Sequence, residues 1–399
     1  MKHTLFLQLA VVAAFLCLQT SCKKEDPADP TPADLPMSEA YVTDSTRVES
    51  DKMTVYNFVY PSTDPYGHPV MLSGTITLGD SVTRQKPALG MILYNHFTIY
   101  RADQCPTRGE LSVQQMLAHS KLITVSPDYY GFGVTESKPQ AYCISRVNAQ
   151  GGVDALLAAR TLLASMGYSW HDTLFNCGYS QGGQTAMGVV RLVAESYPDI
   201  HFTCTFAGAG SYDIPATYRQ FILDSIAGMP STVISVMLAY NNFFNLGIAR
   251  DAMFLEPVLS HIDDWVLSKQ YTRAQIDAMI GSLRVADYIT PTLLDLESDP
   301  SRRFLTAMEG DNLCQGWTPR SDEPIFLFHN IQDITVPPVN TENLFQFLHT
   351  HGANRLSLVI DDFGSSDLLP AHETGAAYFL QRAKELACYF LGIDQLDVY

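Results

Sequence analysis

Positive charge is scarce in this sequence. Its 399 residues contain 25 lysines and arginines against 42 aspartates and glutamates, which gives a formal net charge of −17. Proteins that bind nucleic acid neutralise phosphates with a basic surface, so this composition argues against a nucleic-acid partner. Metal-binding patterns are missing too, because no Cys-x-x-Cys pair or histidine–cysteine cluster has the spacing of a metal site. We therefore expect no metal and no other cofactor.

The N-terminus carries a short apolar run, Leu5–Leu18, after Lys2. The run is too short to span a bilayer comfortably, so it favours a signal peptide over a membrane anchor. The following "QTSC" resembles the lipobox of bacterial lipoproteins, although Gln19 stands where that pattern prefers leucine. The resemblance implies cleavage before Cys22 and lipidation of its thiol. The alternative is an ordinary signal peptide with an incidental cysteine.

The segment after Cys22 is rich in proline and acidic residues and cannot form a core, so it is typical of a flexible tether. Its start, "CKKED", resembles that of lipoproteins from the Bacteroides group, some of which reach the outer surface. We expect an exported lipoprotein of the cell envelope, tethered to the membrane through Cys22. The predicted organisation is a signal peptide at 1–22, a tether at 23–38 and one large domain at 39–399.

Strands and helices alternate through most of this domain. Met53–Tyr60 and Met71–Leu78 are rich in β-formers and predict an antiparallel pair. Apolar strands then alternate with amphipathic helices, which predicts a mostly parallel sheet covered on both faces. The expected strands are 88–95, 122–129, 173–180, 202–210, 324–330 and 355–361, and the expected helices are 111–120, 148–167, 182–197, 341–352 and 375–391. The alternation breaks at about 212–320, where a mainly helical insertion is expected to form a cap.

The stretch "GYSQG" places Ser180 between Gly178 and Gly182, after an expected strand and before an expected helix. This G-x-S-x-G context is that of a nucleophile on a sharp turn, where glycines allow strand and helix to approach closely. The helix N-terminus would direct free N–H groups at developing negative charge. The pattern predicts an α/β-hydrolase fold, in which serine, acid and histidine follow in that order along the chain.

Asp333 follows the expected strand 324–330, where the acid of such a site should lie, and His372 comes after the last strand. The competing acids Asp361, Asp362 and Asp367 lie near the end of the next strand. We expect His372, on a loop before the last helix, to be the base and Asp333 to orient it. The other late histidines, His329, His349 and His351, are interpreted as structural or surface residues. The backbone N–H of Gln181 is expected to be one oxyanion donor, and the other should follow the strand that ends at Asn95.

Several segments together resemble the secretory lipases, the family typified by fungal lipase A. They are "YNHFTIYRADQCP" (Tyr94–Pro106), "SPDYYGFG" (Ser126–Gly133), "GYSQGG", a long helical cap and an H-x-x-x-D-x-x-V-P acid loop. The resemblance implies an esterase or lipase with a triad of Ser180, Asp333 and His372, and a cap that shapes the acyl pocket.

The resemblance carries further implications for single residues. It implies a disulfide from Cys105 to the cap, with Cys314 as the partner and Cys143 as the rival. The chain departs from the family at Phe97, where glycine is usual, so the second oxyanion donor is placed at Phe97 or Thr98. Asp128 is matched as well, and a structural role is expected for it.

The sequence thus predicts a serine carboxylic ester hydrolase that acts through an acyl-enzyme on a small-molecule or lipid ester, as a monomer. Met237, Phe243 and Phe244 in the cap suggest an acyl or aromatic substrate, or simply form the core of the cap. Two enzyme alternatives share the fold: a serine exopeptidase, and an esterase that removes acetyl or feruloyl groups from polysaccharide. The alternative from another class is a catalytically inactive surface binding module.

Overall fold

The structure is a computed structural model that describes residues 39–48, 52–109, 121–365 and 370–393. These residues lie in one compact unit of the chain, Met37–Tyr399. The predicted signal peptide, the lipidated Cys22, the tether and the helix expected at 111–120 lie outside the described residues.

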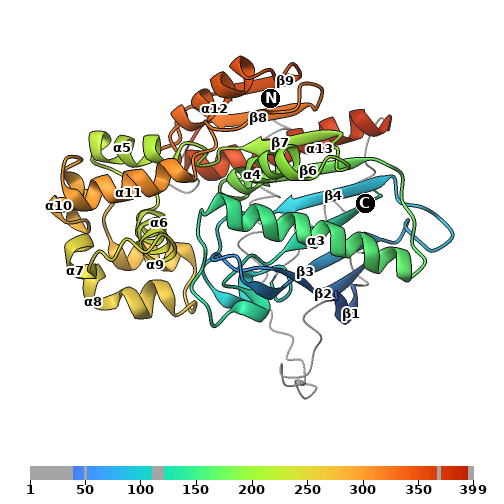
Figure 1. Cartoon of the computed structure of the whole chain (residues 1–399), viewed down its shortest axis with the longest axis horizontal. Coiled ribbons are helices and arrows are strands. Elements are labelled where there is room, and N and C mark those ends of the chain that lie inside the picture. Colours follow the sequence, from blue (N-terminus) through green and yellow to red (C-terminus); the bar gives the residue numbers. More distant parts are fainter. Residues whose placement is uncertain (1–38, 49–51, 110–120, 366–369, 394–399) are drawn as a thin grey trace, which may run out of the picture. The chain divides into compact units, whose positions relative to one another are not determined.

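The described residues build a nine-stranded sheet in the order β1-β2-β3-β5-β4-β6-β7-β8-β9 (Figure 1). From β5 onward neighbouring strands are parallel, while β1, β2 and β3 pair antiparallel at one side. The strands are β1 (Tyr41–Val48), β2 (Met53–Thr63), β3 (Pro69–Gly79), β4 (Gly90–Asn95), β5 (Leu122–Pro127), β6 (Leu174–Tyr179), β7 (Cys204–Gly208), β8 (Ile325–Asn330) and β9 (Leu356–Asp361). The predicted mostly parallel sheet is confirmed, as is the antiparallel pair.

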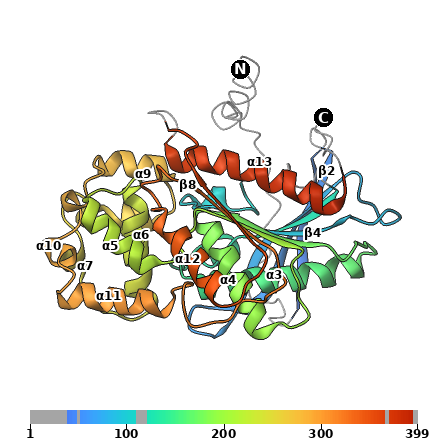
Figure 2. The ribbon, with the colours of Figure 1, turned by 90° about the horizontal axis from the view of Figure 1, so that it is seen from above.

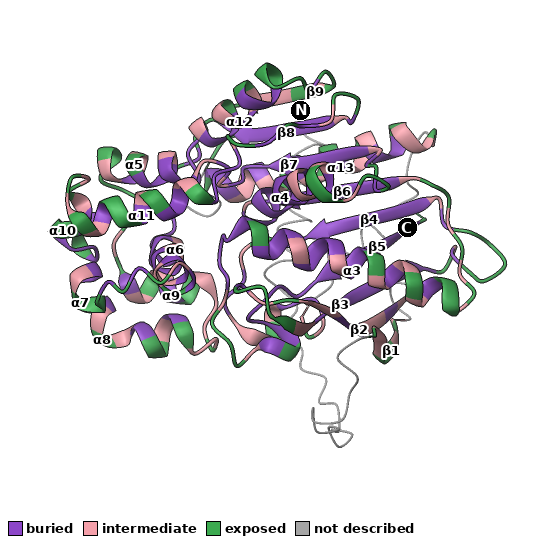
Figure 3. Cartoon of the chain, viewed as in Figure 1, coloured by how far each residue is buried: buried purple, intermediate pink, exposed green. Residues whose placement is uncertain are grey.

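Helices cover both faces of the sheet. Figure 2 shows α13 on one face and α3, α4 and α12 on the other. The helices are α3 (Ser145–Ser165), α4 (Gln181–Ser196), α5 (Ile214–Asp224), α6 (Pro230–Phe243), α7 (Arg250–Met253), α8 (Val258–His261), α9 (Arg273–Ile280), α10 (Pro291–Leu294), α11 (Asp299–Gly310), α12 (Val339–Thr350) and α13 (Ala371–Leu391). Every residue of β4 to β8 is buried between these layers (Figure 3). This explains why those strands are continuous apolar runs in the sequence.

The chain between β7 and β8 contains α5 to α11, which group together beside the sheet (Figure 1). A buried carboxylate joins this cap to the sheet domain: Asp311, just after α11, accepts hydrogen bonds from the Ser145 N–H (2.6 Å) and hydroxyl (3.0 Å). Tyr240 of α6 donates to the same carboxylate (3.2 Å). Asp311 therefore caps the N-terminus of α3 from a distant part of the chain. Burial raises the pKa of this carboxyl, which the hydrogen bonds oppose.

A lysine forms a second attachment. The ammonium of Lys269 donates to the backbone carbonyls of Gly131 (2.5 Å), Glu136 and Lys138 (2.7 Å) in the loop after β5. Burial lowers the pKa of Lys269 to about 8. The cap is thus held to the sheet domain by two partly or fully buried polar groups rather than by apolar packing alone.

The predicted disulfide between Cys105 and Cys314 is wrong. Both residues are free cysteines in the structure, and so is the rival partner Cys143. The reason is that Cys105 packs in a small apolar cluster with Ile99 and Phe132, whereas Cys314 packs against a separate core cluster.

Candidate active site

Ser180 lies on a sharp turn between β6 and α4. Its backbone has φ 60° and ψ −124°, a conformation with positive φ that is rare for residues with a side chain. The Ser180 N–H donates to the carbonyl of Gly208 (2.9 Å), which ties the turn to the neighbouring strand β7. The surrounding structure thus holds the serine in a conformation that isolated chains avoid.

The two flanking glycines are required by close backbone contacts. A Cβ atom on Gly178 would lie 2.0 Å from the carbonyl oxygen of Gly182. A Cβ atom on Gly182 would lie 2.0 Å from the carbonyl oxygen of Asn95, at the end of β4. Any side chain at either position would therefore push strand, turn and helix apart.

The structure brings Ser180, His372 and Asp333 together from three separate parts of the chain. The Ser180 hydroxyl lies 2.8 Å from His372 Nε2, and His372 Nδ1 lies 2.5 Å from Asp333 Oδ2. The carboxylate can only accept, so Nδ1 carries a proton and Nε2 is free to accept one from the serine. All three groups are hydrogen-bonded in series, as a nucleophile, a base and an orienting acid would be.

The electrostatic interactions within the site favour an ionised Asp333 beside a protonated His372. Burial alone would lower the pKa of His372, but the adjacent Asp333 carboxylate outweighs it and raises that pKa above 6.5. Burial alone would raise the pKa of Asp333, but His372 and His329 together hold it below its usual range. The carboxylate therefore stays ionised and stabilises a positive charge on the imidazole.

The sequence interpretation missed His329 as a neighbour of this site. This residue of β8 is fully buried, and its Nε2 lies 3.5 Å from Asp333 Oδ2 and 2.8 Å from the carbonyl oxygen of Val336. Thr341 contacts Nδ1 at 2.6 Å. A carbonyl can only accept, so Nε2 carries the proton and points it toward the acid loop. The H-x-x-x-D spacing of His329 and Asp333 could have indicated this contact, because it places a residue of the strand four positions before the acid in the following loop.

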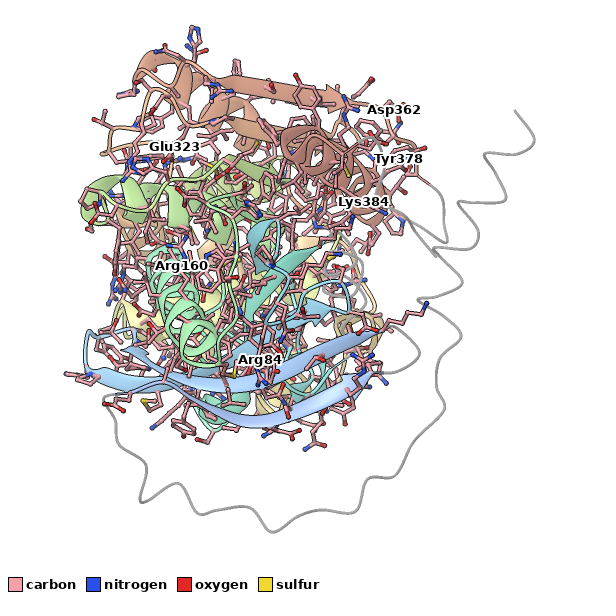
Figure 4. The ribbon with its side chains drawn as sticks, turned by 90° about the vertical axis from the view of Figure 1, so that its right-hand side faces the viewer. Arg84, Arg160, Glu323, Asp362, Tyr378 and Lys384 are labelled. Atoms are coloured by element: carbon pink, nitrogen blue, oxygen red, sulfur yellow. The ribbon has the colours of Figure 1, made fainter. Side chains whose placement is uncertain are left out.

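The acid is fixed by its own loop. Asp333 Oδ1 accepts hydrogen bonds from the N–H groups of Thr335 (2.8 Å) and Val336 (3.0 Å). The competing acids Asp361 and Asp362 are exposed, and Asp362 lies at the outside of the molecule beyond β9 (Figure 4). Asp367 lies outside the described residues. The structure therefore brings only Asp333, among the described candidate acids, to His372.

The predicted loop position of His372 is wrong. Helix α13 begins at Ala371, four residues earlier than expected, so His372 lies in its first turn. Two side chains hold this turn: the Tyr179 hydroxyl donates to the His372 carbonyl (2.8 Å), and Asn330 Nδ2 donates to the Ala371 carbonyl (2.9 Å). The Tyr179 ring also packs at 5.1 Å from the imidazole. Tyr179, the residue directly before the nucleophile, thus helps to hold His372 in position.

The oxyanion candidates differ in their surroundings. Gln181 is the first residue of α4, where a helix has unsatisfied N–H groups. The Thr98 hydroxyl contacts that of Tyr142 (2.9 Å), and Tyr142 lines the cavity beside Ser180. The Phe97 side chain is exposed, and its carbonyl contacts His96 Nδ1 (2.7 Å).

A cavity opens beside Ser180 and lies mainly under the cap. Its volume is about 50 Å³. Its walls come from the nucleophile turn, the acid loop and helices α5, α6 and α11, and the lining includes Ser180, Gln181, Ile214, Phe221, Val233, Met237, Met308 and Val336. Of the aromatic and methionine residues singled out in the sequence, Met237 lines the cavity. Phe243 packs against Tyr66 and Tyr130 instead, and Phe244 stacks on Tyr240.

The sheet order, the strand–turn–helix around Ser180 and the covering helices define an α/β-hydrolase fold. The model of the secretory lipase family matches residues 107–376, and the chain belongs to this family. It is a hydrolase of the lipase and esterase type. A search of curated proteins finds no match to the chain.

Two solved structures illustrate the shared fold. The rice cell wall degrading esterase LipA from Xanthomonas oryzae aligns with a TM-score of 0.71 at 20% identity, covering 90% of this chain and 98% of LipA. Candida antarctica lipase A in its closed state aligns with a TM-score of 0.65 at 15% identity, covering 92% of this chain and 88% of the lipase. Among the described residues, no helix is long and apolar enough to cross a membrane.

Proposed function

We propose that Ser180, His372 and Asp333 are the catalytic triad of a carboxylic ester hydrolase. The observation that carries this proposal is the hydrogen-bonded series from the Ser180 hydroxyl through His372 to Asp333, at the wall of a mainly apolar cavity. Membership of the secretory lipase family supports an ester as the substrate.

The proposed reaction has two halves. Ser180 Oγ attacks the ester carbonyl carbon while His372 Nε2 takes the hydroxyl proton, and the tetrahedral intermediate forms. Its collapse breaks the bond to the alcohol, which leaves with the proton from His372 and leaves an acyl-enzyme on Ser180. Water then repeats the sequence: His372 deprotonates it, it attacks the acyl carbon, and Ser180 regains its proton as the acid departs.

Negative charge develops on the carbonyl oxygen of the substrate in both halves of the reaction, so hydrogen-bond donors are needed in both. The backbone N–H of Gln181 is proposed as the first donor, because it lies at the N-terminus of α4 directly after the nucleophile. The second donor is proposed at Phe97 or Thr98, on the segment that follows β4 and approaches the turn at Gly182. The unreacted carbonyl is bound less well than the oxyanion, so these donors act mainly on the transition state.

The test compares substrates that distinguish an esterase from the alternative enzymes. We expect hydrolysis of p-nitrophenyl esters and covalent labelling of Ser180 by a fluorophosphonate, read by peptide mass spectrometry. Cleavage of aminoacyl p-nitroanilides without ester hydrolysis would support the exopeptidase instead. Release of acetate or ferulate from polysaccharide would identify the third class; LipA, which shares the fold, is a rice cell wall degrading esterase. Absence of both turnover and labelling would support the inactive binding module.

Rates should depend on pH through His372. Its raised pKa keeps the imidazole protonated, and so unable to accept the Ser180 proton, to a higher pH than an ordinary histidine. We therefore expect kcat/KM to fall on acidification with a midpoint above pH 6.5. The measurement is kcat/KM for p-nitrophenyl butyrate from about pH 5 to about pH 9. A midpoint below that of a free histidine would contradict the charge pair with Asp333.

Replacement of Gly182 by alanine should disrupt the nucleophile turn. The new Cβ atom would meet the backbone of Asn95 and His96, which cannot move without displacing β4. We expect at least about a 100-fold loss of kcat/KM, since small displacements of reacting groups cost that much. Gly310→Ala is the matched control, because a Cβ atom there meets nothing within 4 Å. Equal activity of the two variants would show that the turn tolerates a side chain.

We also propose that the mature chain is exported and anchored through a lipidated Cys22. The lipobox-like "QTSC" and the acidic, proline-rich segment after it support this, and the secretory family agrees with export. The Cys22→Ala variant should appear in a soluble fraction, whereas the native chain should partition into detergent with added lipid mass on the N-terminal peptide. A native N-terminal peptide without lipid would leave an ordinary signal peptide as the explanation.

A further inference from the structure

The residue after the proposed base forms an ion pair with the cap. Glu373 follows His372 in the first turn of α13, and Arg273 is the first residue of α9. Arg273 Nη2 donates to Glu373 Oε1 (3.0 Å). Figure 2 shows α9 beside the beginning of α13. The contact therefore joins the helix that carries the base to the helical insertion between β7 and β8.

The guanidinium of Arg273 also binds a second carboxylate, which belongs to the cap. Its Nη1 donates to Asp277 (2.9 Å), one turn further along α9. Asp277 in turn accepts a hydrogen bond from the N–H of Ser231 (2.8 Å), in the first turn of α6, where helices have N–H groups without partners in the helix. Helix α6 supplies Val233 and Met237 to the lining of the cavity. One guanidinium thus connects the helix of the base with a helix of the cavity wall.

A local helix-capping role does not explain Glu373. A glutamate at the third position of a helix often reaches back to the N–H of the capping residue, but here that residue is Pro370, which has no N–H. The second carboxylate oxygen of Glu373, Oε2, is buried and has no hydrogen-bond partner among the described residues. Removing the partner of a buried carboxylate is destabilising, so the pair with Arg273 holds this side chain and the turn that carries it.

We propose that Arg273 is a positioning residue for the catalytic base. Its guanidinium fixes Glu373, and with it the first turn of α13, so that His372 Nε2 stays within reach of the nucleophile (2.8 Å). Tyr179 and Asn330 hold backbone carbonyls of the same turn from the sheet domain, and Arg273 adds a contact from the cap. The cap thus contributes to the reaction as well as to the cavity wall. This inference rests on the proposed role of His372 in ester hydrolysis.

The same ion pair contributes charge near the base. Burial lowers the pKa of His372, and the Asp333 carboxylate more than offsets this effect. Glu373 raises the same pKa further, while Arg273 opposes it. The Tyr179 ring and the hydroxyl of the nucleophile also face the imidazole. Loss of the negative charge of Glu373 should therefore lower the pKa of His372 and move the acid limb of kcat/KM to lower pH.

The experiment measures kcat and KM for p-nitrophenyl butyrate. Arg273→Met keeps the stem of the side chain and removes the guanidinium, and we expect it to lower kcat by about ten- to 100-fold with little change in KM. Arg273→Lys keeps the charge but loses the fork that holds two carboxylates, so its kcat should be intermediate. Arg219→Met is the matched control, because Arg219 pairs with Glu309 inside the cap (3.4 Å). Its kcat should stay within about twofold of wild type.

Glu373→Gln separates the charge from the position of the turn. The glutamine oxygen can still accept from Arg273, so kcat at the pH optimum should stay close to that of the wild type while the acid limb moves to lower pH. Glu385→Gln is the matched control on the same helix, since Glu385 pairs with Arg382 (2.8 Å), and its pH profile should match the wild type. In the Glu373→Gln background, Arg273→Met should lower kcat much less, because no buried carboxylate loses its partner.

Several outcomes would overturn the inference while the wild type hydrolyses the ester. They are an unchanged kcat in Arg273→Met, an equal loss in the Arg219→Met control, an acid limb that stays in place in Glu373→Gln, and an equal effect of Arg273→Met in both backgrounds. Thermal unfolding of each variant shows whether it folds. If Arg273→Met does not fold, the direction of the acid limb in Glu373→Gln decides. Absence of hydrolysis by the wild type would instead refute the proposed function, and this inference with it.

Discussion

Ser180→Ala should lose on the order of 10⁵- to 10⁶-fold in kcat, the largest effect of any single substitution that we expect. The variant removes the only proposed nucleophile, and the remaining groups can assist water attack only weakly. The measurement is p-nitrophenyl butyrate hydrolysis at enzyme concentrations high enough to detect the residual rate, with fluorophosphonate labelling in parallel. Labelling should disappear together with turnover.

The control for Ser180→Ala is a measurement of thermal unfolding, which tests whether the fold is intact. Ser180 has a positive φ, which alanine tolerates no better than serine, and the Ser180 N–H bond to Gly208 is unaffected by the change. Thermal unfolding should therefore stay close to the wild type. Residual activity above a tenth of wild type, with the fold intact, would remove Ser180 from the reaction.

Asp333→Asn should lose on the order of 10⁴-fold in kcat. The amide nitrogen of asparagine, placed at Oδ2, would donate to His372 Nδ1 and so favour the tautomer with its proton on Nε2. That tautomer cannot accept the Ser180 proton. The amide also removes the charge that raises the pKa of His372, so any residual activity should show its acid limb at lower pH than in the wild type.

Asp362→Asn is the matched control for this second prediction. Asp362 is exposed and accepts a hydrogen bond from Gln332 (2.8 Å), whereas His372 is hydrogen-bonded to Asp333. We expect its kcat to stay within about twofold of wild type, as surface substitutions usually do. The reverse result, with Asp362→Asn inactive and Asp333→Asn active, would show that another carboxylate orients the base.

The strands that are buried on both faces are the parts of the fold that the sequence predicts most directly. Strands β4 to β8 are fully buried, so each reads as an apolar run, and glycines mark the turn at Ser180 because the backbone contacts there exclude a Cβ atom. The edge strand β1 escaped prediction because its residues are half-exposed and polar, and only pairing with β2 holds it in the sheet.

The features of the site that the sequence did not predict depend on contacts between segments that are distant along the chain. The start of α13 is set by Tyr179 and Asn330, which no local pattern around His372 reveals. His329 was interpreted as structural, and its contact with the acid appears only when β8 and the loop after it are folded. The expected Cys105 bridge failed for the same kind of reason, because the family pattern gives a cysteine but not the position of its partner.

The Asp311 carboxylate limits how this enzyme could be re-engineered. Grafting the cap of one lipase onto another is an obvious way to change acyl preference, and the junctions after β7 and before β8 look convenient. A donor cap that lacked an acceptor at position 311 would leave the Ser145 N–H and hydroxyl, at the start of α3, buried without partners. A chimera should therefore keep Asp311 with the recipient chain and place its second junction between α11 and this residue.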